Sequence, residues 1–182
     1  MTHPTLHVAA SARRSSALTV TVEATAKADL AHVWDVFVPI DLAVVFPCAK
    51  GPIPAVTGTS GQTGRWDVVG RSRVVHLSDG RHVREEITAS EPSDGRAPQD
   101  GSASFAYRVD GFTGPFGLLA REARGSWTFT QIAPGQTRIV WTYEFEPTGF
   151  LGSLPLRVIA PTFWRAYMRD GLANIVRRVK AA

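Results

Sequence analysis

The most constraining feature of the sequence is a strictly alternating segment close to a long amphipathic one. In residues 136–147 (QTRIVWTYEFEP) Ile139, Trp141, Tyr143 and Phe145 fall on one face, and polar side chains fall on the other. A period of two predicts a half-buried strand of an antiparallel sheet. The aromatic face of this strand therefore needs a second layer to cover it.

Residues 153–179 can supply that layer as an amphipathic helix. Large apolar side chains recur along one arc of this segment, and charged side chains occupy the opposite arc. Ser153 and Pro155 are typical of a helix start, and Pro161, which has no N–H, predicts a kink or a second start. The two aromatic surfaces can pack together, either closely or with a hollow between them. The apolar arc consists of Phe163, Trp164, Tyr167, Met168, Gly171, Ile175 and Val179.

The length and composition are those of one globular domain. The chain has 182 residues, 44% of them hydrophobic, which is enough to bury a core. We expect a flexible N-terminal arm over residues 1–15 and a single domain over residues 16–182. No segment approaches the roughly 20 apolar residues of a membrane span, and the first residues lack the apolar core of a secretory signal. We therefore expect a cytoplasmic protein.

Several kinds of chemistry are excluded by the residue types. The single cysteine, Cys48, allows neither an intrachain disulfide nor a multi-thiolate metal site, and we expect it to be packed as a small hydrophobic residue. The sequence predicts no metal site and, lacking nucleotide-binding fingerprints, no cofactor. Residues 157–180 carry six basic side chains and one acidic one. Without a nucleic-acid-binding motif, they indicate a solvated helix face and no nucleic-acid partner.

The N-terminal part predicts a strand and two short helices. Residues 16–25 alternate as a first strand. Asp29 and Asp41 are typical N-caps of short helices, which end at Pro39 and Pro47.

The middle of the chain predicts a meander of strands joined by short turns. Residues 49–64 are rich in Gly, Pro, Ser and Thr, which favours an irregular crossing segment. The fold class is thus α+β, with six or seven strands and a long C-terminal helix. The expected later strands cover residues 70–77, 81–89, 103–112, 124–132 and 136–147.

Segments spread over about residues 18–180 carry a resemblance to a known superfamily. They are AKADLAHVWDVF, WDVVGRSRVVHLSDGRHVREEI, FAYRV, GSWTFT and TRIVWTYEFEP. The chain resembles the START-like, helix-grip superfamily called SRPBCC and, within it, the polyketide cyclase/dehydrase and lipid-transport group. The resemblance implies a curved antiparallel sheet wrapped around the C-terminal helix, with a pocket between them for a hydrophobic or amphipathic small molecule. Members include carriers, cyclases, hormone receptors and chaperone activators, so the fold does not choose the activity.

Strand parity identifies charged side chains on the apolar face of the central hairpin. If residues 78–80 form a three-residue loop, Arg73 pairs with Glu85 and both face inward. If residues 79–80 form a two-residue turn, Arg73 faces outward and His76 becomes the pocket candidate. Glu85 faces inward in both registers. Arg73 and Glu85 are candidate catalytic residues, since such a pair can anchor a polar group or assist proton transfer. The alternative for Glu85 is a rim position or a carboxylate held by backbone donors.

Aromatic residues on the predicted inner faces are the candidate ligand-binding residues, although ordinary core packing also explains them. A Gly-rich loop at residues 111–123 carries apolar side chains that suit a pocket lid, or a loop packed against the helix. The ligand-binding candidates are Phe105, Tyr107, Trp127, Phe129, Trp141, Tyr143, Phe163, Trp164 and Tyr167, and the lid candidates are Phe112, Phe116 and Leu118.

Three functions are compatible with these observations. The first is binding of a lipid or polyketide-like small molecule in the pocket. The second is a polyketide cyclase or dehydratase that uses acid–base residues in the same pocket. The third is a protein-interaction module of the chaperone-activator type that uses the basic helix face. The sequence leaves the ligand and the oligomeric state open.

Overall fold

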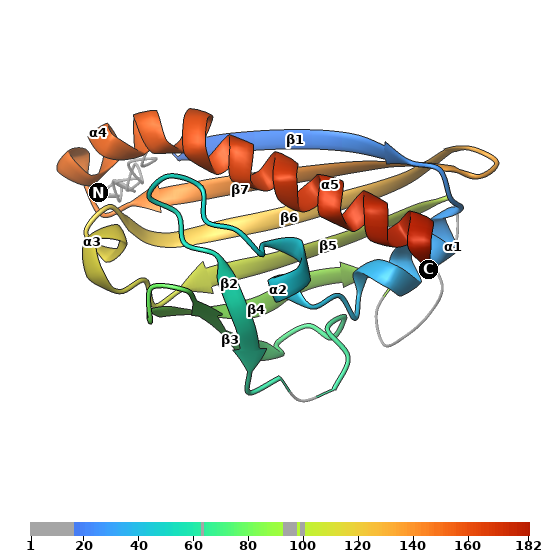
Figure 1. Cartoon of the computed structure of the whole chain (residues 1–182), viewed down its shortest axis with the longest axis horizontal. Coiled ribbons are helices and arrows are strands. Elements are labelled where there is room, and N and C mark those ends of the chain that lie inside the picture. Colours follow the sequence, from blue (N-terminus) through green and yellow to red (C-terminus); the bar gives the residue numbers. More distant parts are fainter. Residues whose placement is uncertain (1–16, 63, 93–97, 99–100) are drawn as a thin grey trace, which may run out of the picture.

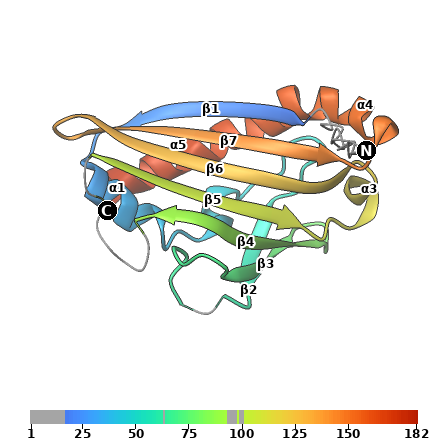
Figure 2. The same cartoon turned by 180° about the vertical axis from the view of Figure 1, so that it is seen from behind.

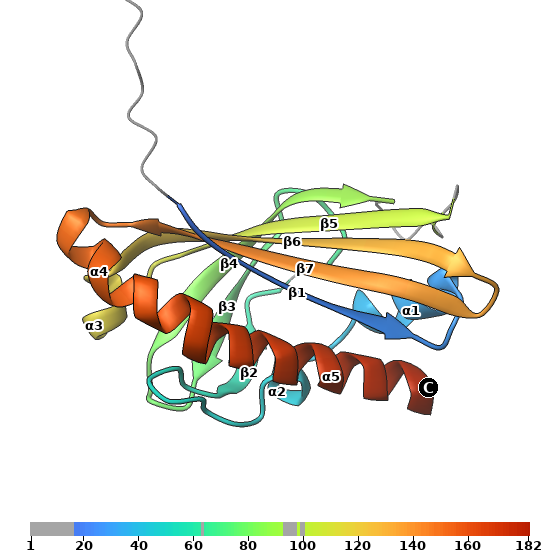
Figure 3. The same ribbon diagram turned by 90° about the horizontal axis from the view of Figure 1, so that it is seen from above.

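The computed structural model describes residues 17–62, 64–92, 98 and 101–182, so the expected arm at residues 1–15 lies outside the described residues. The described chain forms a seven-stranded antiparallel sheet in the order β1-β7-β6-β5-β4-β3-β2. The sheet curves around the C-terminal helix (Figures 1 and 3), which confirms the predicted α+β helix-grip fold. The strands are β1 (Leu18–Ala26), β2 (Val56–Ser60), β3 (Ser72–Leu77), β4 (His82–Glu91), β5 (Ser102–Asp110), β6 (Ala120–Ala133) and β7 (Gln136–Pro147).

Helical segments cover the concave face of the sheet and its two ends. The C-terminal segment runs along the sheet (Figure 1), and α5 packs along β1. Seen from the other side, in Figure 2, the convex face of the sheet lies in front of α5. The helices are α1 (Leu30–Phe37), α2 (Leu42–Val45), α3 (Gly114–Gly117), α4 (Phe150–Ile159), the π-helical turn η1 (Ala160–Trp164) and α5 (Arg165–Ala181).

The C-terminal helix begins earlier than the sequence suggested. Helix α4 starts at Phe150, so the expected start at Ser153 and Pro155 is wrong, and Pro155 lies inside the helix. The Ser153 hydroxyl donates to the carbonyl of Phe150 at 2.7 Å, a bond within the first turn rather than a cap. Pro161 lies in the π-helical turn between α4 and α5, at the place where the missing N–H predicted an interruption.

An edge strand occupies part of the segment that was expected to be irregular. Strand β2 pairs antiparallel with β3, although only Val56 in it is a large apolar residue. An edge strand with one bonded neighbour needs little alternation, so its polar composition hid it. The expectation of irregular chain throughout residues 49–64 is therefore wrong at residues 56–60.

The two expected N-caps differ in the structure. Asp41 caps α2 by accepting a hydrogen bond from the N–H of Ala43 at 2.9 Å. Asp29 makes no such bond with α1 and instead accepts from the N–H of Gly135 at 2.7 Å. The Gln131 side chain accepts from the N–H of Leu30 at 2.6 Å. A residue distant in sequence therefore takes the capping role that Asp29 was expected to fill.

The single cysteine lies at the surface of the protein. Cys48 is exposed, so its predicted packing as a small hydrophobic residue is wrong. No helix in the described part of the chain is long and apolar enough to cross a membrane.

Candidate functional site

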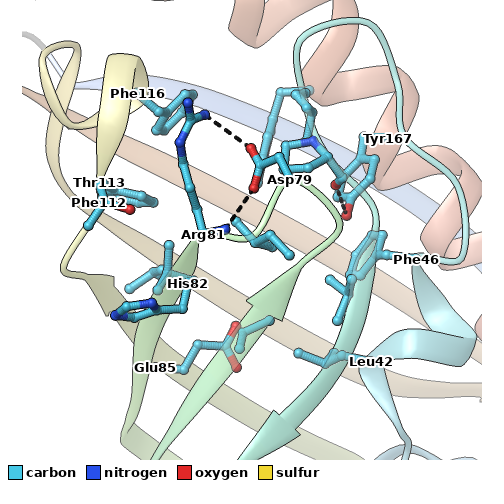
Figure 4. Close-up of a pocket in the computed structure, with 18 of the residues that line it drawn as sticks. Leu42, Phe46, Asp79, Arg81, His82, Glu85, Phe112, Thr113, Phe116 and Tyr167 are labelled. Carbon is cyan, nitrogen blue, oxygen red and sulfur yellow. Dashed lines mark hydrogen bonds and ion pairs between the residues drawn. The ribbon is translucent and has the colours of Figure 1, made fainter.

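A cavity of about 130 Å³ lies between the sheet and the C-terminal helix. Strands β3, β4, β5 and β7 supply one wall, and Trp164 and Tyr167 of the C-terminal segment supply another. Residues 52–54, in the segment before β2, add to the lining. Figure 4 shows Phe46 and Tyr167 together on one side of the cavity. A second cavity of about 50 Å³ lies toward α1. Both cavities are lined by Leu42, Phe46, Glu85, Tyr107 and Trp141.

Aromatic rings give the larger cavity rigid walls. Tyr167 stacks on Phe46, with the ring centroids 4.4 Å apart, and its hydroxyl donates to the carbonyl of Pro54 at 3.0 Å. On the sheet side, the Trp141 and Tyr143 rings lie edge to face, and Tyr143 also contacts Trp164 with centroids 4.6 Å apart. Because these rings also contact one another, the cavity does not depend on a ligand to hold its walls in place.

The central hairpin adopts the register with the three-residue loop. Arg73 is opposite Glu85, and the N–H of Leu77 donates to the carbonyl of Arg81. Gly80 has φ +81°, a left-handed conformation that favours glycine at the end of such a loop. Arg73 and Glu85 therefore face inward. His76 is exposed and its ring bonds the Ser60 hydroxyl, so its alternative role in the pocket is wrong.

Arg73 and Glu85 form a buried ion pair. Arg73 is 7% exposed and Glu85 9% exposed, and the Arg73 Nε donates to Glu85 Oε2 at 2.8 Å. The Arg73 Nη2 also lies 2.8 Å from Oε2. The guanidinium stacks 4.0 Å from the ring centre of Trp66 and donates to the side-chain oxygen of Gln62 at 3.4 Å. These contacts hold the Arg73 guanidinium in one position against the Glu85 carboxylate.

Three buried tyrosines share the cavity with Glu85. Burial raises the pKa of Tyr107, Tyr143 and Tyr167 well above the ordinary value of a phenol. The negative charge of Glu85 raises the pKa of Tyr107 and Tyr143 further, although by less than burial does. The phenols are therefore neutral at physiological pH and can donate hydrogen bonds.

The mouth of the larger cavity, where the lining is partly exposed, carries an ion pair and aromatic side chains next to each other. Arg81 pairs with Asp79 at 3.0 Å, and Figure 4 shows the end of the Arg81 side chain beside Phe116. Phe112 and Phe116 line the cavity with their ring centroids 5.1 Å apart, and the Arg81 guanidinium packs against Gly114, which lies between them in the chain.

One of the lid candidates lies away from this opening. Leu118 is 76% exposed and lines neither cavity, which contradicts its expected place over the pocket. Movement of the segment around α3 as a lid stays a prediction.

Most of the predicted ligand-binding residues line a cavity, but two do not. Phe129 is fully buried among Trp34 and Phe37, because α1 covers that part of the sheet. Phe163 is 40% exposed and its ring lies over Gly51, because the π-helical turn rotates it away from the sheet. Their expected place in the pocket is therefore wrong. Tyr107, Trp141, Tyr143, Trp164 and Tyr167 line the larger cavity, and Phe105 and Trp127 line the smaller one.

Sequence reasoning missed the wall formed before β2. Phe46, Pro52, Ile53 and Pro54 line the larger cavity, and Val56 extends the same wall. Prolines in a Gly-rich stretch are normally read as surface loop. The apolar Ile53 between two prolines was the one available signal of a buried contact. In the part of the chain that the structure describes, no group of three or more His, Cys, Asp or Glu side chains could hold a metal ion.

A curved antiparallel sheet that encloses a long C-terminal helix, with an apolar cavity between them, defines the START-like helix-grip class, SRPBCC. Residues 17–180 match the family model described as polyketide cyclase/dehydrase and lipid transport, and the chain belongs to this family. This membership supports a hydrophobic ligand-binding fold. Comparison with curated proteins gave no significant match.

Solved structures show the same fold at low sequence identity. The Zhui aromatase/cyclase from a Streptomyces species has a TM-score of 0.60 and 15% identity, over 90% of this chain and 94% of that one. Norcoclaurine synthase from Thalictrum flavum, in complex with dopamine and hydroxybenzaldehyde, has a TM-score of 0.59 and 10% identity, over 98% of both chains. A major latex-like protein from Panax ginseng has a TM-score of 0.57 and 17% identity, over 88% of this chain and 96% of that one.

Proposed function

We propose that this protein binds a small, largely apolar molecule between the sheet and the C-terminal helix. The observation that carries the proposal is the cavity of about 130 Å³ with aromatic walls. An apolar cavity of about 150 Å³ is large enough to hold benzene. The larger cavity is therefore suited to one aromatic ring, with room for a second toward its mouth.

The similar proteins support a ligand of this size. In the norcoclaurine synthase complex the same fold holds dopamine and hydroxybenzaldehyde, each with a single aromatic ring. The ion pair of Asp79 and Arg81 at the mouth gives a ligand that is polar at its outer end a place to remain solvated. An amphipathic ligand, with its apolar body inside, fits both features.

Isothermal titration calorimetry with naphthalene tests the proposal. Val109→Phe fills the larger cavity from β5, because Val109 is buried in its wall. We expect the wild type to bind naphthalene and Val109→Phe to bind it at least about tenfold more weakly, a loss of about 1.4 kcal/mol. The matched control is Val140→Phe, since Val140 of β7 lines neither cavity and should tolerate the change. A wild type that binds no naphthalene, or equal binding by Val109→Phe, would contradict the proposal.

A second candidate function is acid–base catalysis in the same cavity, as in a polyketide cyclase or dehydratase. The observation that favours it is the Glu85 carboxylate beside the neutral phenols of Tyr107 and Tyr143, because a base and a proton donor then face one space. We expect dehydration of an aryl β-hydroxyketone to the conjugated enone, followed by its absorbance, to be faster with the wild type than in buffer. We expect Glu85→Gln to abolish the difference. A wild-type rate equal to that in buffer would exclude this activity for that substrate class.

A further inference from the structure

We infer that the second carboxylate oxygen of Glu85, Oε1, is a recognition point for a neutral hydroxyl group carried by an aromatic ligand in the cavity. The inference rests on the proposed function and adds to it the polar group that the ligand must carry. It concerns binding and holds whether or not a reaction follows.

The ion pair uses only one of the two carboxylate oxygens. Both short contacts of Arg73, from Nε and from Nη2, reach Oε2 of Glu85. Within residues 17–62, 64–92, 98 and 101–182, Oε1 accepts no hydrogen bond. A carboxylate has acceptor capacity on both oxygens, and Glu85 lines both cavities. The side chain therefore presents a free acceptor beside the aromatic and aliphatic side chains that β3, β5 and β7 contribute to the larger cavity.

The position of Arg73 decides which kind of ligand group this acceptor suits. Arg73 lines the smaller cavity but not the larger one, so the larger cavity meets the carboxylate without the guanidinium. A ligand carboxylate would place two negative groups together. A ligand ammonium would add a third charge to a pair that is already neutralised, at the expense of its own hydration. A neutral hydroxyl donates one hydrogen bond and adds no net charge.

The acceptor is also held in place before any ligand arrives. Oε2 is bound twice by Arg73, whose guanidinium stacks on Trp66 and reaches Gln62. Rotation of the carboxylate would break these contacts, so Oε1 keeps its direction. Binding of a hydroxyl then loses little conformational freedom at this point, and a hydrogen bond to a charged acceptor is among the stronger kinds.

A ligand series on the wild-type protein tests this inference. Calorimetric titration at pH 7 compares 2-naphthol with 2-methoxynaphthalene, which lacks the donor and is larger, and with naphthalene, which lacks it and is smaller. A hydrogen bond to a charged group corresponds to roughly tenfold or more in affinity. We expect 2-naphthol to bind at least about tenfold more tightly than both other compounds. Equal affinities would overturn the inference and leave the proposed function standing, whereas no binding of any compound would contradict the proposed function itself.

A paired substitution assigns the preference to Glu85. Arg73→Met with Glu85→Leu removes both charges at similar volume, a replacement that leaves many buried ion pairs neutral or more stable. We expect the preference for 2-naphthol over naphthalene to fall to about twofold or less, with naphthalene binding retained. The control is Arg138→Met with Glu23→Leu, an exposed ion pair between β7 and β1, which should keep the preference. A preference that survives in the first double variant would overturn the inference, and if that variant does not fold, the wild-type series decides.

Discussion

The inner face of the sheet is solid at one end and hollow at the other, although aromatic side chains supply both ends. At the solid end, α1 places Trp34 and Phe37 on Phe129, with centroid distances of 5.6 and 4.8 Å from that ring. At the hollow end, Tyr107 and Tyr143 face the segment around Pro54 on one side and the C-terminal helix on the other. These elements leave a cavity between themselves and the sheet. The comparison teaches that residue type does not decide whether an aromatic face is core or binding site. The element opposite decides it.

The charged pair lies where the two kinds of packing meet. Glu85 lines both cavities, and Arg73 is stacked on Trp66 behind it. Burial of a charge in a solid core requires compensation at every oxygen. Here the cavity leaves Glu85 Oε1 without a hydrogen bond from a described residue, whereas Oε2 is held by Arg73. One oxygen of the carboxylate therefore contributes to packing, and the other is available to a ligand.

The largest expected effect is at the solid end. Phe129→Ala should lower the free energy of unfolding by about 3–5 kcal/mol, because the fully buried ring leaves a void that α1 cannot fill. Urea denaturation measures this loss. At the hollow end, Phe116→Ala should lower it by less than about 2 kcal/mol, since the ring is only half-buried. Equal losses would contradict the division into solid and hollow ends.

The second effect concerns the tyrosines of the hollow end at alkaline pH. Burial raises the folded-state pKa of Tyr107 and Tyr143 above the ordinary 10.0, so the folded protein holds these protons more tightly than the unfolded chain. Their contribution to stability is complete below pH 10 and is lost as the pH rises from 10 toward the raised values. The expected loss is about 1.4 kcal/mol per pH unit for each group.

Urea denaturation at about pH 9 and about pH 11 measures this slope. The Tyr107→Phe, Tyr143→Phe double variant should lose less stability over this range than the wild type, because it lacks the two hydroxyl groups that titrate. Lysine titration affects both proteins alike, so the difference in slope isolates the tyrosines. Identical slopes would show that the two phenols are not buried as described.

The third effect comes from a substitution in the sheet that should partly fill the larger cavity. The Tyr107 ring covers Gly125 of β6, and a Cβ added there would lie 2.1 Å from Tyr107 Cζ. Gly125→Ala should therefore push the ring into the cavity, weaken naphthalene binding several-fold and lower stability by about 1–3 kcal/mol. Calorimetry and urea denaturation measure the two changes. Ser126→Ala is the control, since Ser126 lies on the other face of the same strand. Unchanged naphthalene affinity in Gly125→Ala would show that Tyr107 does not border the binding space.

The smallest effect separates two of the lid candidates. Leu118 is exposed and outside the cavity, so Leu118→Ala should change stability by no more than about 0.5 kcal/mol and leave naphthalene affinity unchanged. Phe116 lines the cavity, and Phe116→Ala should weaken binding measurably. If Leu118→Ala weakened naphthalene binding as much as Phe116→Ala does, Leu118 would have to contact the ligand, although it does not line the cavity.

Local pattern predicted much of this protein. Alternation predicts that Ile139, Trp141, Tyr143 and Phe145 share a buried face, which the structure confirms. The turn residues of the central hairpin allow two registers, and the structure has the one whose three-residue loop ends in Gly80. The capping of α1 by Gln131 could not be predicted, because that contact joins residues 101 positions apart. The exposure of Phe163 depends on a π-helical turn, which shifts the angular position of every later side chain.

The sequence by itself determined which side chains share one face of a strand, because the two-residue period of a strand is a local property. Glu85 faces the interior in either hairpin register for that reason. Only the tertiary structure decided that Tyr107 and Tyr143 border a cavity whereas Phe129 is solid core. That outcome depends on the shape of the segments packed opposite, and their positions are set by contacts between residues far apart in the chain.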